Sequence, residues 1–341
     1  MQRIHLPLLC AALLCAACGS QPLDEWSDAA YSEAHNIVRQ TLLETHADEC
    51  GMLAISVATG RVVASQVFVR DSLGQPVAGG ADHSLALYHE PVRLGDLFAP
   101  VLTTAALSSL RVDTADRFSV VDAFVRDERR IYVNGMPLDS LTLRQAMAAG
   151  SHAALSSFGN HCWQGDCAAL VADALVCNTT TDTAYHLRLP DTLIGDTAFF
   201  QLCIGHHARQ PLAGIAAFYN TLARGGVPVS NFPVAENEPA LPGKPLCSRD
   251  VAARMTALLQ GAGEIGPAAQ ALSRLPFRVA AKSARIPMPD GSGRCECTAL
   301  VGYFPADNPH YTLLLYVKNS APATPAVADA FCRIAEVAMK Q

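Results

Sequence analysis

Serine and lysine side chains are the groups in this chain that could carry out acyl transfer, because a serine one helical turn before a lysine has its base at hand. The chain of 341 residues contains four lysines, which are Lys244, Lys282, Lys318 and Lys340. The residues three positions before these lysines are all apolar: Leu241, Val279, Leu315 and Val337. No Ser-x-x-Lys spacing therefore occurs in the sequence, and a nucleophile of that kind is absent.

The stretch from Glu90 to Leu107 is the one around which we expect the chain to be organised. It reads as a loop followed by a buried helix that ends near Leu110. Gly95 gives the backbone the freedom for a sharp entry into this helix. Asp96 is a good N-cap residue. We therefore predict that the Asp96 carboxylate caps the helix and that the first helical turn faces a cleft.

This stretch resembles the active-site segment of the penicillin-binding transpeptidases, which are serine enzymes that cross-link peptidoglycan. Their segment reads roughly Glu-Pro-Gly-Ser-x-Phe-Lys-Pro, with the serine as nucleophile and the lysine as its proton partner. The framework residues are kept here as Glu90, Pro91, Gly95, Phe98 and Pro100. The resemblance puts Asp96 at the serine position and Ala99 at the lysine position, after three extra residues, Val92, Arg93 and Leu94.

The second and third motifs of that family have also changed. Its Ser-x-Asn motif matches Gly150 and His152, and a shift of one residue would match Ser151 and Ala153 instead. Its Lys-Thr-Gly motif matches Lys282, Ser283 and Ala284, on an expected strand over residues 277–286. The lysine and a hydroxyl are retained there, but a methyl group replaces the glycine at a point where ligand and backbone approach closely.

A longer match covers the segment from Cys203 to Gly226. Where the family carries Ile-Gly-Gln-Gly, this chain has Ile-Gly followed by His206 and His207. Neighbouring residues of an extended chain point to opposite sides, so we interpret these histidines as structural or cleft-lining groups and not as metal ligands. A helix then follows, with Pro211 expected at its first position and two glycines closing it at Gly226.

The elements needed to hold these residues can be read from apolar periodicity and turn residues. Asp71–Asp82 reads as a polar loop. Helices are expected over residues 27–47, 142–155, 168–176, 211–226, 250–261 and 325–339. Strands are expected over 52–57, 61–69, 277–286 and 311–317, and residues 298–309 resemble the family's penultimate strand. The resemblance implies a mixed α/β (α+β) fold in which a five-stranded antiparallel sheet is flanked by helices and joined to an all-helical lobe.

The N-terminus reads as a targeting segment of residues 1–18. Arg3 supplies a positive charge, and the apolar run from Leu6 to Ala17 is too short for a stable membrane span. The run ends at Cys18 in a pattern similar to a bacterial lipoprotein cleavage site, and an ordinary signal peptide cut nearby is the alternative. We expect a lipid anchor on Cys18, a tether over residues 19–27 and one transpeptidase-like domain over 28–341, facing the periplasm.

Composition limits the possible partners. Half of the residues are hydrophobic, 16% are charged and the formal net charge is −6, so a folded protein is expected and a nucleic-acid partner is not. Nine of the 12 cysteines follow Cys18, and this odd number leaves at least one thiol outside any disulfide within the chain. Cys162 and Cys167 are close enough in sequence to pair. Cys295 and Cys297 do not have zinc-module spacing, and we predict no metal and no cofactor.

Three functional hypotheses follow. The first is an exported transpeptidase-like protein without acyl-transfer chemistry, which binds peptidoglycan stem peptides or a cell-wall synthesis protein. The second is an active penicillin-binding enzyme with a non-standard nucleophile, Ser108 or Ser283. Ser108 has Arg111 where its base belongs, and arginine stays protonated. The third is an unrelated exported binding protein.

Overall fold

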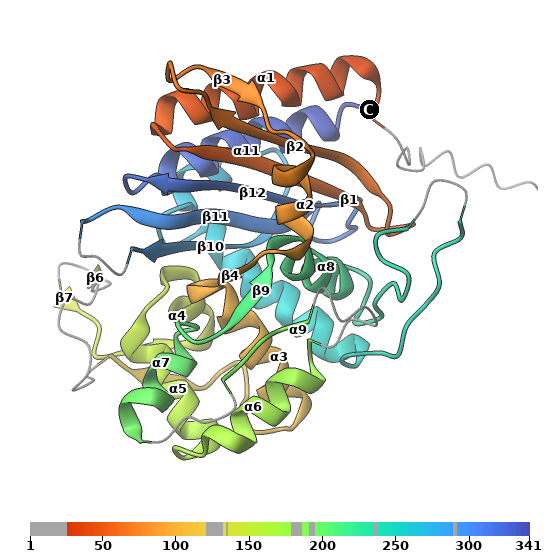
Figure 1. Cartoon of the computed structure of the whole chain (residues 1–341). Helices are drawn as coiled ribbons and strands as arrows, with labels where there is room; N and C mark the ends of the chain where they lie inside the picture. The colour runs from red at the N-terminus through yellow and green to blue at the C-terminus, as the bar shows by residue number, and fades with distance from the viewer. Residues whose placement is uncertain are drawn as a thin grey trace, which may run out of the picture.

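A computed structural model describes residues 26–120, 132–133, 136–178, 186–190, 195–234, 238–288 and 292–341. The targeting segment, Cys18 and the tether up to residue 25 lie outside the described residues. Figure 1 shows a sheet with helices on both of its faces and a mainly helical lobe beyond one edge of the sheet.

The main sheet has six antiparallel strands in the order β10-β11-β12-β1-β2-β3. Their bounds are β1 Glu49–Ser56, β2 Val62–Arg70, β3 Pro76–Ala78, β10 Ala280–Pro287, β11 Cys295–Phe304 and β12 Tyr311–Ser320. The prediction of five strands was wrong, because the sheet has a sixth strand, the short edge strand β3. This strand lies in the segment expected to be a loop. The Asp71 side chain accepts hydrogen bonds from the backbone N–H groups of Leu73 and Gln75, so the chain turns tightly and pairs with β2.

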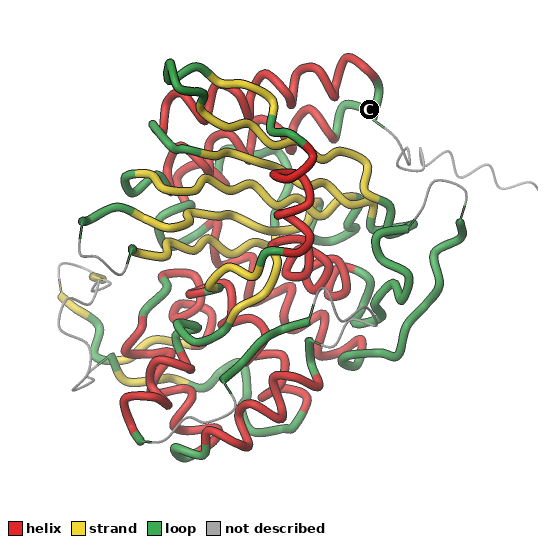
Figure 2. The backbone as a smooth tube through the Cα atoms, in the orientation of Figure 1, coloured by secondary structure: helices red, strands yellow, loops and turns green. Residues whose placement is uncertain are grey.

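Two long helices cover one face of this sheet (Figure 2). They are α1 (Asp28–Thr45) and α11 (Thr324–Ala338), from opposite ends of the described chain. The Ser27 hydroxyl caps α1 by accepting a hydrogen bond from the Ala30 N–H. A core cluster that includes Leu300, Phe304 and Phe331 fills the space between sheet and helices.

The remaining helices cover the opposite face of the sheet, form the lobe beyond its β10 edge, or, in the case of α10, pack against α11 (Figure 1). These are α2 (Ala81–His89), η1 (Gly95–Phe98), α3 (Ala99–Ser108), α4 (Leu143–Ala149), α5 (His152–Trp163), α6 (Cys167–Val176), α7 (Asp196–Cys203), α8 (Leu212–Ala223), α9 (Arg249–Leu259), η3 (Gln260–Gly263) and α10 (Ala269–Leu272). Short strand pairs join this part of the chain: β4 (Pro91–Arg93) with β9 (Arg209–Pro211), β5 (Arg117–Ser119) with β8 (Ser140–Thr142), and β6 (Tyr132–Val133) with β7 (Met136–Pro137).

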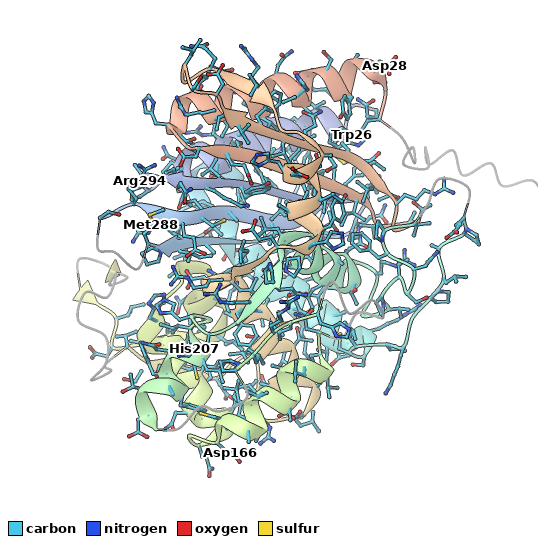
Figure 3. All side chains as sticks on the ribbon, viewed as in Figure 1. Trp26, Asp28, Asp166, His207, Met288 and Arg294 are labelled. Carbon is cyan, nitrogen blue, oxygen red and sulfur yellow. The ribbon has the colours of Figure 1, made fainter. Side chains whose placement is uncertain are left out.

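The expected buried helix is α3, and nine of its ten residues are buried. It lies inside the larger core cluster, which joins the helical lobe to the sheet through residues such as Phe98, Leu102 and Val301. Pro211 is the N-cap residue of α8 and not its first helical residue as predicted. Figure 3 shows how far the lobe extends, from His207 to Asp166 at its far end.

Candidate functional site

The three altered motifs meet at the junction between the sheet and the helical lobe. Asp96 comes from η1, Gly150 ends α4, His152 begins α5, and Lys282 lies on β10. The correspondence assigned from the sequence therefore places four residues from distant parts of the chain in one group. We call Asp96, His152 and Lys282 the junction cluster.

Asp96 is the centre of the junction cluster. Its Oδ1 lies 3.2 Å from His152 Nε2, and its Oδ2 lies 3.7 Å from Lys282 Nζ. The Lys282 ammonium also donates a hydrogen bond of 3.0 Å to the carbonyl oxygen of Ser283. The Lys282 side chain is only 2% exposed, so its charge is neutralised by the protein itself. The position of the family's nucleophile thus holds one half of an internal ion pair.

The prediction that Asp96 caps the central helix was wrong. The chain enters α3 through the η1 turn, so Asp96 lies inside a helical turn and not before it. The N-cap residues of η1 and α3 are Leu94 and Phe98, and neither makes a side-chain capping bond. The carboxylate points to Lys282 and His152 instead. The expected backbone freedom of Gly95 is confirmed by its φ of +48°.

The charges of the cluster follow from burial and from its neighbours. Burial raises the pKa of Asp96, but Lys282 and the hydrogen bond with His152 outweigh burial and lower this pKa below its ordinary value. Burial lowers the pKa of Lys282, and the Asp96 carboxylate only partly opposes this shift. Asp96 is therefore an ionised carboxylate at neutral pH, suited to holding a cation and not to accepting an acyl group.

Gly150 makes room for the Asp96 carboxylate. Its φ is +65°, and a Cβ atom built at this position would lie 2.5 Å from Asp96 Oδ2 and 3.5 Å from Lys282 Nζ. A serine at position 150 could not coexist with the present position of Asp96. In the other register, the Ser151 hydroxyl caps α5 by accepting a hydrogen bond from the Ala154 N–H. The aspartate at position 96 and the glycine at position 150 are thus sterically linked.

Ala99 and Ala284 supply no chemical group to the site. Ala99 is the first residue of α3, is 2% exposed, and carries a methyl where a base would be required. Ala284 belongs to the same core cluster as Ala280 and Ile286. Since side chains alternate along a strand, Lys282 shares that face of β10 and Ser283 lies on the opposite face.

The two serines considered as alternative nucleophiles lack a suitable base. Ser283 is 6% exposed and faces away from Lys282. Ser108 is the last residue of α3 and lies near the thiol of Cys177, whose pKa burial raises to about 11. Neither environment activates a hydroxyl group in the way that serine catalysis requires.

His206 lies beside the junction cluster. Its ring and that of His152 are perpendicular, with centroids 6.1 Å apart. Burial lowers the pKa of His206, and the neighbouring His152 adds to this shift. Leu94 and Gly95 hold the backbone of this segment by donating hydrogen bonds to the carbonyl oxygens of Ala208 and Gly205.

The sequence analysis did not predict the ion pair between Arg93 and Glu296 near the site. Arg93 donates to Glu296 of β11 over 2.9 Å, and also to the carbonyl oxygen of Pro287. Arg93 is one of the three extra residues before Gly95, and this insertion forms β4. The insertion was visible in the sequence, but its partner lies 203 positions away.

Other expected features can be checked in the described residues. All nine cysteines after Cys18 are free thiols, so the pairing of Cys162 with Cys167 considered from the sequence is not present. Within the described ranges, no group of three or more histidine, cysteine or acidic side chains is arranged to hold a metal ion. None of the described helices combines the length and the apolar character that crossing a bilayer requires.

Comparisons with solved structures identify the fold. The chain is similar to a peptidoglycan glycosyltransferase from Burkholderia ambifaria, with a TM-score of 0.70 and 14% identity over 92% of this chain and 96% of the other. It is also similar to the TP domain of penicillin-binding protein 3 from Burkholderia pseudomallei, with a TM-score of 0.67 and 16% identity over 94% and 96% of the two chains. No family description matches the sequence, and no curated protein matches it. The chain has a penicillin-binding transpeptidase-like fold, as its motif framework predicted.

Proposed function

We propose that this protein is an exported transpeptidase-like protein of the cell envelope that has lost serine acyl transfer and acts by binding. The observation that carries this proposal is the pairing of Asp96 with Lys282 at the position of the family's serine. Loss of a serine nucleophile costs a serine enzyme several orders of magnitude in rate, and the matching base is also absent at Ala99.

The proposed partners are peptidoglycan stem peptides or a protein of cell-wall synthesis. The fold supports this choice, since both similar structures carry names from peptidoglycan synthesis. The targeting segment and Cys18 support a lipid anchor at the membrane surface facing the periplasm. No metal, cofactor or nucleic acid takes part in the proposed role.

The proposal is tested by measuring binding and turnover on the same folded preparation. Purified peptidoglycan is sedimented with the protein, and a peptide ending in D-alanyl-D-alanine is incubated with it and followed by mass spectrometry. We expect co-sedimentation without release of D-alanine. Release of D-alanine would support an active enzyme, and a protein left in the supernatant would contradict peptidoglycan binding.

The lipid anchor is tested separately by mass spectrometry of the protein isolated from a bacterial membrane fraction. The expected mass corresponds to a chain that begins at a lipidated Cys18. The Cys18→Ala variant should leave the membrane fraction. An unlipidated chain cut at another position would establish an ordinary signal peptide instead.

A further inference from the structure

A pocket of about 580 Å³ lies apart from the junction cluster. It forms where the link between α10 and β10 meets η3 and the turn that follows β11. Its size is within the range of roughly 300–1,000 Å³ that small-molecule sites occupy. The lining residues are Gln260, Gly263, Glu264, Leu272, Ser273, Leu275, Pro276, Phe277, Arg278, Val279, Pro305 and Asp307.

The apolar part of the pocket is supported by the core beneath α11. Leu272 and Val279 are buried members of that core cluster, and Leu275 and Phe277 are partly buried and pack against it. The Phe277 ring stacks on Phe304 of β11, with centroids 5.7 Å apart and planes at 25°. This surface is held in place from below, so it can accept an apolar side chain without rearrangement.

The polar part offers one charge of each sign. Arg278 is exposed, and its guanidinium makes no hydrogen bond or ion pair with any residue that the structure describes. Asp307 is also exposed, and its carboxylate has only a long contact of 3.4 Å with Gln260 Nε2. Ala306 N–H donates to the carbonyl oxygen of Arg278 over 2.8 Å, which joins the segment before β10 to the turn after β11.

The third charged lining residue is already neutralised. Both carboxylate oxygens of Glu264 accept hydrogen bonds from the guanidinium of Arg144 on α4. The Ser273 hydroxyl likewise donates to the Gln270 carbonyl oxygen. The charges left for a ligand are therefore the Arg278 guanidinium and the Asp307 carboxylate, beside an apolar surface.

We propose that this pocket binds a short zwitterionic peptide of dipeptide length with apolar side chains. The peptide carboxylate would bind Arg278, since guanidinium and carboxylate form two parallel hydrogen bonds. The terminal ammonium would bind Asp307, and an apolar side chain would rest on Phe277. This proposal is independent of whether the junction cluster has lost acyl transfer.

The test is isothermal titration calorimetry of the whole folded protein with the dipeptide leucyl-leucine. Its N-acetylated and C-amidated forms each remove one charge. We expect binding of the zwitterion, with affinity at least about tenfold lower for either blocked form, because each loses a charge-assisted hydrogen bond. Arg278→Ala and Asp307→Asn should each cause a similar loss.

Arg285→Ala is the matched control, since Arg285 is an exposed arginine on β10 outside the pocket lining. This variant should bind leucyl-leucine as tightly as the wild type. Circular dichroism establishes that each variant is folded. Absence of heat at millimolar dipeptide, equal affinity for the three forms, or an equal loss in Arg285→Ala would each overturn the proposal.

Discussion

Two groups of this protein share a carboxylate, a lysine and a histidine and differ in how these side chains are bonded. The junction cluster contains Asp96, Lys282 and His152. The sheet cluster contains Glu49 of β1, Lys318 and Tyr316 of β12, and His83 of α2. Each contains a carboxylate, a lysine and a histidine, yet only the junction cluster comes from the segments whose sequence resembles the transpeptidase motifs.

The sheet cluster is the more completely bonded group. Glu49 lies 2.9 Å from Lys318 Nζ, 3.0 Å from the Tyr316 hydroxyl and 3.0 Å from His83 Nδ1. In the junction cluster, the Asp96–Lys282 distance of 3.7 Å exceeds that of a good hydrogen bond. Glu49 and Lys318 face each other on neighbouring strands, which explains their shorter distance.

The pKa shifts of the two lysines point in opposite directions. Burial lowers the pKa of Lys318, but Glu49 outweighs burial and the net pKa is raised. For Lys282, burial is the larger effect and the net pKa is lowered. Glu49 thus outweighs the burial of Lys318 in the sheet pair, whereas Asp96 does not outweigh the burial of Lys282 in the junction pair. We interpret the sheet cluster as structural, and the junction cluster as the less completely compensated of the two groups.

Glu49→Gln should give the largest loss of stability. The variant leaves Lys318, Tyr316 and His83 without their shared carboxylate, and we expect about 3 kcal/mol lower unfolding free energy in urea. Glu33→Gln, at an exposed position of α1, is the control and should change stability little. A loss below that of Asp96→Asn would reverse the comparison between the clusters.

Gly150→Ala should lower the unfolding free energy by about 2 kcal/mol, because a side chain at positive φ is strained and its Cβ collides with Asp96. Gly165→Ala is a matched control, since Gly165 has a φ of +83° but no atom within 4 Å of an added Cβ. Both variants place a side chain at positive φ, so the difference between their urea midpoints measures the effect of the collision with Asp96. Equal losses in the two variants would show that the Asp96 carboxylate does not occupy that space.

Asp96→Asn should lower the unfolding free energy by about 1–2 kcal/mol. This loss is smaller than that of Glu49→Gln, because Asp96 makes one long ion pair and one hydrogen bond. The measurement is again urea unfolding, with an unchanged slope. Asp329→Asn is the surface control, since its pair with Arg274 spans 3.8 Å and both side chains are more than half exposed. A stabilised Asp96→Asn variant would indicate that Lys282 is held by other groups.

The pH dependence tied to His206 should be the smallest effect. Its pKa is lower in the folded chain than in the unfolded chain, so the unfolded state takes up the proton first on acidification. Stability should therefore fall as the pH drops below the ordinary histidine value of about 6.5. The slope should be shallower in His206→Gln than in the neighbouring control His207→Gln, as measured by urea unfolding at several pH values.

The framework of the fold was predictable because local patterns determine it. The hairpin of β1 and β2, the strands β10 to β12 and the helices α1, α8, α9 and α11 follow from periodicity and end residues. The edge strand β3 and the helix α2 were missed, because β3 has only three residues beside a glycine-rich loop and α2 is a short, mostly exposed helix with one buried residue. The family's motif order also identified Asp96, Gly150, His152 and Lys282 as one site.

The partners of those residues were not predictable. An aspartate before an apolar helix is an ordinary cap by local rules, and only the packing of β10 against η1 turns Asp96 to Lys282. Arg93 and Glu296 are joined in the same way, through the position of a three-residue insertion. Contacts between residues about 200 positions apart depend on tertiary geometry, which a single sequence does not specify.

The central claim is that the junction cluster has replaced the acylated serine. The most direct test is intact-mass spectrometry of the folded chain from residue 19 onward, after incubation with a fluorescent penicillin at millimolar concentration. We predict an unchanged mass and no label. A single adduct on a serine, lost when that serine is replaced by alanine, would contradict the claim and identify the true nucleophile.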